Sequence, residues 1–347
     1  MKNLLITGLM VLLFSCKKDD PVVVPEKYDN GLILLNEGLF QQNNASISFY
    51  DIQQGESYQQ VFQAENNRGL GDTANNFEKY TLGDSTYLII AVDISSQLEI
   101  VHAGSLKSVA QIPVFNGSIA REPRRVLVAG DKAYSCNYDG TVSVVDLNTY
   151  KITNTITVGQ NPDGMLIVDN RLYVANSGGL NYPVYDSTMS VIDLNTETLI
   201  STFETRINSS AMLKDSEGDI YLLSNGNYSD VAPAMLHIDT ETNQVLQQFD
   251  VSIGGWDLKG EWLYYYDFDL QGIYRFNTLS ETFENMQLLD AAGHTTFYGL
   301  YILGNDLFTV DANDYVNSST VRCYDLNGNH KYEFTAGLNT TDLILNE

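Results

Sequence analysis

An all-β fold is predicted by short runs in which apolar and polar residues alternate, bounded by Asn, Asp and Gly. The clearest runs, at 132–136, 141–146 and 152–158, belong to one segment, 131–164, that recurs along the chain. Asp146, Asp193 and Asp239 end the same strand in three successive copies, 47 and 46 residues apart. That period is typical of one four-stranded propeller blade, so the chain is predicted to be a β-propeller.

Seven copies of the repeat can be counted. They begin near Gly31, Ser85, Asp131, Asn170, Gly218, Gly260 and Asn305. Each copy holds three strands, and a fourth, such as 163–168, follows the third and belongs to the next blade. The first copy has no such strand before it, whereas the last copy continues into 339–346. We therefore expect seven four-stranded antiparallel blades over residues 31–347, the ring closed by a C-terminal strand that joins the first blade.

Two copies depart from the pattern, since Val101-His102 and Phe276-Asn277 replace the hydrophobe-Asp pair at the strand end. Cys136 and Cys323 lie on blades far apart in the ring, so we expect two small core residues and no disulfide.

The N-terminal residues have the layout of an export signal. An early Lys is followed by an apolar run at 4–14, which is too short to span a bilayer, and then by Ser15 and Cys16. A Cys directly after the apolar run resembles a bacterial lipoprotein signal. The resemblance implies a signal peptide at 1–15, a lipidated Cys16 and a charged, Pro-containing tether to residue 30. An ordinary secretory peptide with an incidental Cys is the alternative.

The charge balance excludes one class of partner. With 44 acidic against 19 basic residues, the formal net charge is −25. Nucleic acid and anionic lipid are bound through clustered Lys and Arg, so we expect neither as a partner of the folded part.

The repeats resemble a known family. The segments 172–176 (LYVAN), 189–196 and 156–164 are similar to the YVTN/YncE-type propeller repeat. This resemblance implies the fold and leaves the function open, because propellers include both enzymes and binding modules.

A second resemblance covers nearly the whole mature chain. The segments 34–38 (LLNEG), 45–51 (ASISFYD) and 66–76 are similar to the opening of surface propeller lipoproteins encoded beside TonB-dependent transporters in Bacteroidota, of which the BtuG type captures cobalamin. An acidic cluster just after the lipidated Cys, here 19–20, resembles the signal for outward display in that group. The resemblance implies a non-catalytic lipoprotein on the outer-membrane surface. Such a protein would bind cobalamin or another corrinoid and pass it to a TonB-dependent transporter.

The candidate site is the face of the ring that carries the long loops. Two sets of loops meet there: those between the first and second strand of each copy, and those that lead into the next blade. They are rich in Asn, Tyr, Ser, Asp and Gly, as recognition surfaces are, whereas the opposite turns are short. The candidate ligand-binding residues are Asn36, Glu37, Asn76, Arg125, Asn137, Tyr138, Asn176, Tyr182, Tyr185, Asn225, Tyr228, Trp256, Asp267, His294, Phe297, Asp311 and Tyr315.

Other interpretations of these residues remain open. Asn, Asp and Gly also populate ordinary turns, and the aromatic residues could pack at the rim. Asp267-Phe268-Asp269 and Asp311-Ala312-Asn313-Asp314 have oxygen spacing suited to a structural Ca²⁺, although neither completes a twelve-residue loop. No cofactor is expected, and the four His lack zinc or haem spacing.

Two further functions also remain open. The cargo could be a ferric siderophore, haem or a glycan, for which five arginines fall in loops of the favoured face: Arg68, Arg121, Arg124, Arg125 and Arg206. A metal-dependent hydrolase of the lactonase kind would need acids and amides from several blades to converge on the axis. A ring of hydrogen-bonded polar side chains would use the same residues.

Overall fold

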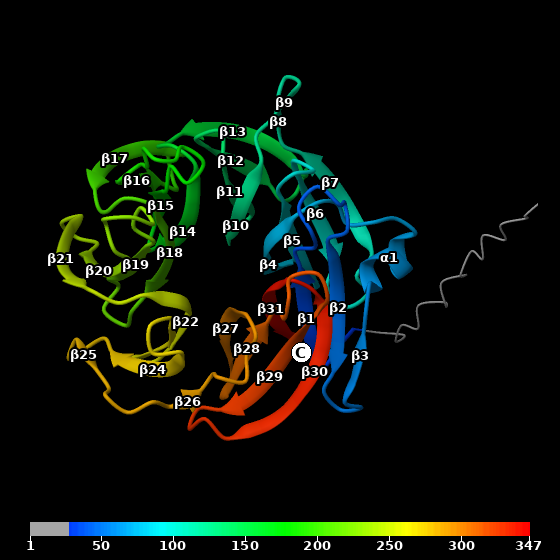
Figure 1. The fold of residues 1–347 in the computed structure, drawn as a ribbon. Helices are drawn as coiled ribbons and strands as arrows, with labels where there is room; N and C mark the ends of the chain where they lie inside the picture. The colour runs from blue at the N-terminus through cyan, green and yellow to red at the C-terminus, as the bar shows by residue number, and fades with distance from the viewer. Residues whose placement is uncertain (1–27) are drawn as a thin grey trace, which may run out of the picture.

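The computed structural model describes residues 28–347, which form a ring of seven antiparallel sheets around a central axis (Figure 1). The predicted seven-bladed β-propeller is confirmed. The signal peptide, Cys16 and most of the tether lie outside the described residues.

Each blade has the same strand order, from the axis outward. The first three blades comprise β31 (Thr340–Asn346), β1 (Gly31–Asn36), β2 (Ser46–Asp51) and β3 (Glu56–Tyr58); β4 (Ala74–Leu82), β5 (Ser85–Val92), β6 (Gln97–His102) and β7 (Ser108–Pro113); and β10 (Pro123–Ala129), β11 (Lys132–Asn137), β12 (Thr141–Asp146) and β13 (Lys151–Thr157). The next two comprise β14 (Pro162–Val168), β15 (Arg171–Asn176), β16 (Thr188–Asp193) and β17 (Thr198–Glu204); and β18 (Ser209–Lys214), β19 (Ile220–Ser224), β20 (Ala234–Asp239) and β21 (Gln244–Phe249). The last two comprise β22 (Ile253–Lys259), β23 (Trp262–Asp267), β24 (Gly272–Asn277), β25 (Thr282–Phe283) and β26 (Leu289–Asp290); and β27 (Phe297–Leu303), β28 (Asp306–Asp311), β29 (Ser318–Asp325) and β30 (His330–Leu338).

The two ends of the propeller meet in blade 1. Strand β31 pairs antiparallel with β1, so that Gly31 lies opposite Asn346 and Leu34 opposite Leu343. The Nδ2 of Asn346 donates a hydrogen bond to the carbonyl oxygen of Tyr28 at 2.7 Å. The closing strand predicted at 339–346 is therefore present, and the ring has no open edge at the junction.

The hydrophobic core is divided among the gaps between neighbouring blades. Strand β1 shows why, because Leu32 and Leu34 pack with blade 7, whereas the alternate residues Ile33 and Leu35 pack with blade 2. The described residues form seven such clusters, one for each pair of adjacent blades. Both faces of a blade are buried, so the second and third strands are nearly continuous in apolar residues.

The strand-ending Asp of the repeat builds the short turns of one face. An oxygen of Asp146 accepts hydrogen bonds from the backbone N–H groups of Asn148 and Thr149, both at 2.9 Å. Asp193 and Asp239 do the same for the residues that follow them. Asn277, one of the departures from the repeat, still accepts a hydrogen bond from the N–H of Ser280 at 2.9 Å. An amide can replace the carboxylate here because both offer an acceptor oxygen at the same place.

Three features interrupt the regular blades. A hairpin of β8 (Phe115–Asn116) and β9 (Ile119–Ala120) projects between blades 2 and 3, and α1 (Val61–Asn66) covers the side of blades 1 and 2 (Figure 1). In blade 6 the outer strand is split into β25 and β26. No helix within residues 28–347 has the length and hydropathy needed to cross a bilayer.

Candidate ligand-binding face and axial cavity

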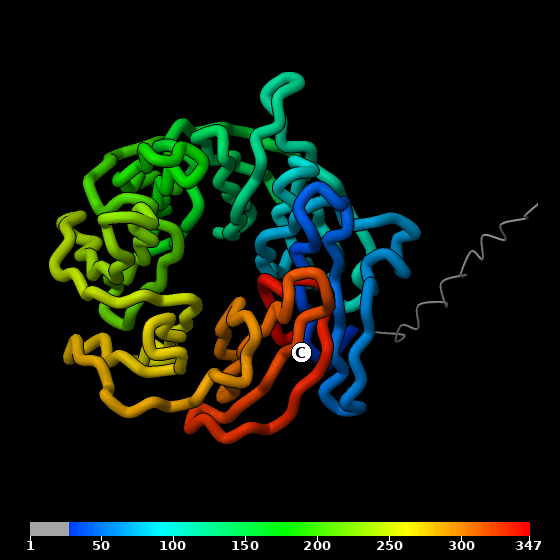
Figure 2. The backbone as a smooth tube through the Cα atoms, viewed as in Figure 1, coloured from blue at the N-terminus to red at the C-terminus, as the bar shows by residue number. Residues whose placement is uncertain are grey.

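The loops between second and third strands and the connections between blades lie on one face of the ring, here called the loop face (Figure 2). Three of the candidate tyrosines meet there over blades 4 and 5. The ring of Tyr185 stands edge-on to that of Tyr182, with 6.3 Å between centroids, and edge-on to that of Tyr228, at 6.4 Å. Tyr182 is 72% exposed and Tyr228 is 77% exposed, so the outer two rings present their surface to solvent.

Exposed apolar residues continue around the loop face. They lie in the loops β1–β2, β15–β16, β23–β24 and β28–β29, and in the β8–β9 hairpin: Phe40, Leu180, Val184, Phe268, Leu270, Tyr315, Val316 and Ile119.

Most of the candidate asparagines support the scaffold instead. Asn36, Asn137 and Asn176 are fully buried at the ends of the second strands. The Nδ2 of Asn176 donates hydrogen bonds to Thr188 Oγ1 at 2.9 Å and Ser190 Oγ at 3.0 Å, and its Oδ1 accepts the N–H of Gly159 at 3.0 Å. The Asn176 amide therefore joins its blade to the connection that enters it, and Asn36 does the same, since its Oδ1 accepts the N–H of Gly337 at 3.0 Å.

The candidate acids cap their own loops. Asp311 accepts backbone hydrogen bonds from Thr295, Thr296 and Asn313, at 2.9, 2.8 and 2.9 Å. Asp267 accepts the N–H groups of Asp269 and Leu270, at 2.9 and 3.0 Å. Within residues 28–347, no three His, Cys, Asp or Glu side chains form a group suited to hold a metal ion.

His294 and Phe297 are packed at the base of the loops. The Nε2 of His294 lies 2.7 Å from Thr309 Oγ1, and Phe297 stacks on Tyr266 with 3.9 Å between ring centroids. Burial and the nearby Arg322 lower the pKa of His294, so the imidazole is neutral at physiological pH. These two residues belong to rim packing.

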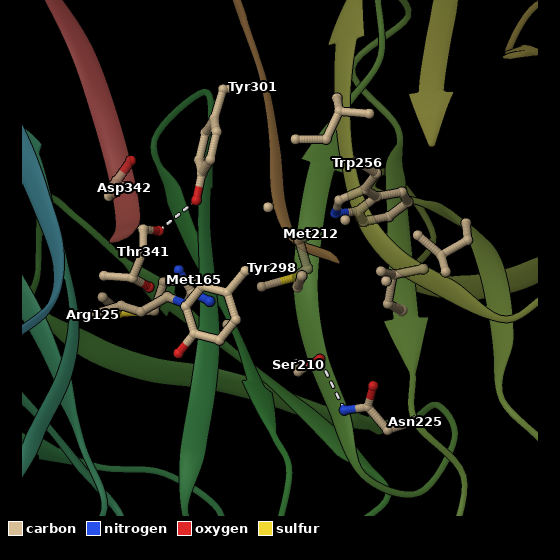
Figure 3. Close-up of a pocket in the computed structure, with 18 residues that line it drawn as sticks. Arg125, Met165, Ser210, Met212, Asn225, Trp256, Tyr298, Tyr301, Thr341 and Asp342 are labelled. Atoms are coloured by element: carbon tan, nitrogen blue, oxygen red, sulfur yellow. Dashed lines mark hydrogen bonds between the residues drawn. The ribbon is translucent and has the colours of Figure 1, made fainter. Parts of the chain in front are cut away.

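The axis holds a cavity of about 350 Å³ lined by the inner strands of six blades. Arg125, Trp256 and Asn225, three candidates from the sequence, line it. Figure 3 shows Arg125, Tyr298 and Tyr301 on one side, with Met212 and Trp256 across from them. The sequence had indicated Arg125 and Trp256 as loop residues, but they lie on β10 and β22. Sequence reasoning missed Met165, Met212, Tyr298, Tyr301 and Asp342, for which the only signal was their place on an inner strand.

An ion cluster lies at the loop-face end of the axis. The Nε of Arg124 donates to Asp163 Oδ1 at 3.0 Å, its Nη1 donates to Asn75 Oδ1 at 2.5 Å, and its guanidinium lies over the Tyr138 ring. Burial alone would raise the pKa of the Asp163 carboxyl, but the charges of Arg124 and Arg125 outweigh it and hold the pKa below the usual range. Nearby, the Tyr298 hydroxyl donates a short hydrogen bond to Glu37, and the Tyr298 ring packs edge-on against the ring of Tyr315.

Polar side chains also accept hydrogen bonds from backbone N–H groups on the inner strands, at the edges that face the axis. Asn76 Oδ1 accepts the N–H of Val126 at 2.7 Å, and Asp257 Oδ2 accepts that of Ile302 at 2.7 Å. Asp342 Oδ2 accepts the N–H of Phe77 at 3.3 Å. Each bond joins neighbouring blades, and it supplies a partner for an N–H that has no further strand to pair with.

Four acids near the axis have raised pKa values: Glu78, Asp93, Asp257 and Asp342. Burial and the adjacent Asp342 charge raise the pKa of Glu78 to about 7. Burial raises the pKa of Asp342 to about 6 and that of Asp93 to about 6, although hydrogen bonds and neighbouring arginines oppose both shifts. The region around the axis therefore carries more negative charge above pH 7 than below pH 6, because more of these carboxyl groups are ionised.

Two arginines of the loop face are paired with carboxylates. Arg68 pairs with Glu99 at 2.7 Å, and Arg121 pairs with Asp139 at 2.5 Å. Arg206 donates to Gln248 and to the carbonyl oxygen of Ala232, which are neutral acceptors. Among the five arginines, positive charge without a close carboxylate in the described part of the chain is thus limited to Arg206 and to Arg125, whose Nε lies 3.8 Å from Asp163.

A family model matches residues 30–341 of the chain, and its description is a domain of unknown function, DUF5074. The chain belongs to this family. No curated protein matches it.

Solved structures share the fold of this DUF5074 protein at low identity. A quinonprotein alcohol dehydrogenase-like protein from Bacteroides thetaiotaomicron is 13% identical, with a TM-score of 0.66 over 92% of this chain and 79% of that one. Hydrazine synthase from Kuenenia stuttgartiensis is 17% identical, with a TM-score of 0.58 over 69% of this chain and 73% of that one. The WD40 domain of Neurospora crassa Pan2 is 11% identical, with a TM-score of 0.57 over 78% of this chain and 81% of that one. At these identities the likeness concerns the fold alone.

Proposed function

We propose that this DUF5074 propeller is a non-catalytic lipoprotein of the outer-membrane surface that binds a nutrient on its loop face. The ligand is cobalamin or another corrinoid, which the protein passes to a TonB-dependent transporter. The observation that carries the proposal is the exposed cluster of Tyr182, Tyr185 and Tyr228. Aromatic rings with hydroxyl groups suit a large, flat ligand with many amides, because the rings supply contact area and the hydroxyls supply hydrogen bonds.

The position of the tether supports this orientation. The backbone N–H of Tyr28 donates to the carbonyl oxygen of Gly104 at 3.2 Å, and Gly104 lies in the β6–β7 turn on the face opposite the loops. A lipid at Cys16 would therefore hold the opposite face toward the membrane. The dozen or so residues between Cys16 and Tyr28 can span at most about 40 Å. The loop face would then point outward, open to ligand and transporter.

Titration calorimetry tests the proposal on a soluble chain that begins at Pro21. Cyanocobalamin should bind with measurable heat, and the Tyr182→Ala/Tyr228→Ala double variant should weaken binding at least tenfold. Met286→Ala is the matched control, because Met286 is 69% exposed on the outer side of blade 6, away from the loop face. Absence of heat and of any change in the corrinoid spectrum would remove the corrinoid from the proposal. If the double variant and the wild type bound cyanocobalamin with equal affinity, the ligand would have to bind at a place other than the tyrosine cluster.

A further inference from the structure

The Arg125 side chain stands out on the axis because it is 40% exposed toward the cavity and its closest carboxylate contact, with Asp163, is a loose one. Within residues 28–347, its Nε is shielded from solvent and has no hydrogen-bond partner. The nearest carboxylate oxygen, Asp163 Oδ1, lies 3.8 Å from that Nε and already accepts a hydrogen bond from Arg124. Buried polar groups in native proteins almost always have partners, so an unpartnered buried donor requires an explanation.

Most other polar groups that line the cavity have hydrogen-bond partners. Asp342, the one carboxylate among the described lining residues, accepts the N–H groups of Leu343 and Phe77, and the Tyr301 hydroxyl donates to the carbonyl oxygen of Thr341 at 2.5 Å. The Nδ2 of Asn225 donates to Ser210 Oγ at 3.1 Å. The Arg125 guanidinium therefore remains the charged donor of the cavity that a ligand could pair with.

The opposite wall is apolar and partly aromatic. Met212 and Trp256 face Arg125 across the cavity, and Met165 lies beside Arg125 (Figure 3). The volume of about 350 Å³ is in the lower range of small-molecule sites and far below what a corrinoid needs. The first residues of the inner strands line this space, so a ligand would enter from the loop face.

We propose that the axial cavity binds a small planar organic carboxylate, with its carboxylate on the Arg125 guanidinium and its ring against Trp256 and the two methionines. The guanidinium fork matches a carboxylate with two parallel hydrogen bonds, and a flat ring gains contact with the indole and the thioethers. This site is separate from the tyrosine cluster and does not depend on the ligand proposed for the loop face.

Benzoate, with benzamide as its neutral counterpart, tests the proposal at one fixed pH of 6. The chain contains two tryptophans, and Trp262 packs under Arg275 at 4.9 Å, so Trp256 is the fluorophore that lines the cavity. Benzoate should change the fluorescence saturably and bind at least tenfold more tightly than benzamide, because benzamide cannot accept a charge-assisted pair of hydrogen bonds.

Two variants locate the effect. Arg125→Gln should lower benzoate affinity to that of benzamide, and Arg125→Lys should also weaken it, because an ammonium lacks the fork. Arg171→Gln is the control, since Arg171 begins β15 at the opposite face. Tyr182→Ala/Tyr228→Ala should leave benzoate binding unchanged, so that failure of this site and failure of the loop-face proposal can be told apart.

Three results would overturn the proposal. One is no saturable change in the wild type up to about 10 mM benzoate. Another is equal binding of benzoate and benzamide. The third is benzoate affinity that stays the same in a folded Arg125 variant, with folding checked by circular dichroism and thermal melting. The comparison of the two ligands on the wild type needs no variant, so the test stands even if Arg125 proves essential for folding.

Discussion

Glu78→Gln should make the propeller more stable at alkaline pH. Glu78 lies on β4, and no hydrogen bond or ion pair of its carboxyl is found among residues 28–347. Its pKa rises from 4.5 to about 7, chiefly through burial and then through the Asp342 charge. The folded state therefore binds the proton more tightly than the unfolded state. The stability from this proton is fully present below pH 4.5 and is lost as the pH rises through 7.

The size of the effect follows from the shift. One pKa unit corresponds to about 1.4 kcal/mol, so a carboxyl with this shift costs at most roughly 3 kcal/mol when ionised. Since the side chain is only partly shielded from solvent, we expect about 1–3 kcal/mol. Glutamine carries no charge at any pH, so the variant should gain this amount over the wild type at pH 8 and nearly none at pH 4.5.

Urea denaturation at pH 4.5, 6, 7 and 8 measures the effect through the midpoint and slope of each curve. Glu241→Gln is the control, because Glu241 is exposed in the turn after β20 and should give a small difference that does not depend on pH. A free-energy difference between Glu78→Gln and wild type that stays constant from pH 4.5 to 8 would refute the reasoning. So would a variant that is less stable than wild type at pH 8.

Three other changes test the scaffold. Asn176→Ala should cost roughly 2–4 kcal/mol of unfolding free energy, because it removes the acceptor of the Gly159 N–H and the amide donor to the hydroxyls of Thr188 and Ser190. Urea denaturation would show this loss, and a loss under about 1 kcal/mol would contradict the structural role. Gly164→Ala should lower the melting temperature strongly or prevent folding, because a Cβ there would lie 1.6 Å from the carbonyl oxygen of Ser210 on the next inner strand. A melting curve like that of the wild type would refute this close approach. Deletion of residues 340–347 removes the inner strand of blade 1, so limited proteolysis should cleave the chain first within residues 31–58. Uniform resistance to the protease would show that the ring does not need β31.

The sequence was sufficient for the architecture because each blade repeats the same local pattern. The strand-ending acids Asp146, Asp193 and Asp239 marked the turns, and the extra run at 339–346 marked the closing strand. The loop tyrosines at 182, 185 and 228 were also identifiable, since loop aromatic residues have no role in forming a turn.

The contents of the axis could not be predicted in the same way. Arg125, Met212 and Trp256 belong to three different blades, and only the closed ring brings them around one cavity. Asn176 was ambiguous for another reason. A polar residue at a strand end has the same sequence signature whether it contacts a ligand or holds a neighbouring backbone, and its hydrogen bonds decide between them.

The junction in blade 1 has a consequence for how the molecule is made. The hydrogen bond between Asn346 and Tyr28 spans 318 residues of sequence, and β1 cannot acquire its inner neighbour until the last residues of the chain have been synthesised. Contacts of such long range slow folding, because the ends must find each other before they gain any stability. The nascent chain should therefore stay unclosed throughout translation. For the exported lipoprotein proposed above, this delay would be useful, since the ring would close only after the C-terminus has followed the rest of the chain across the membrane.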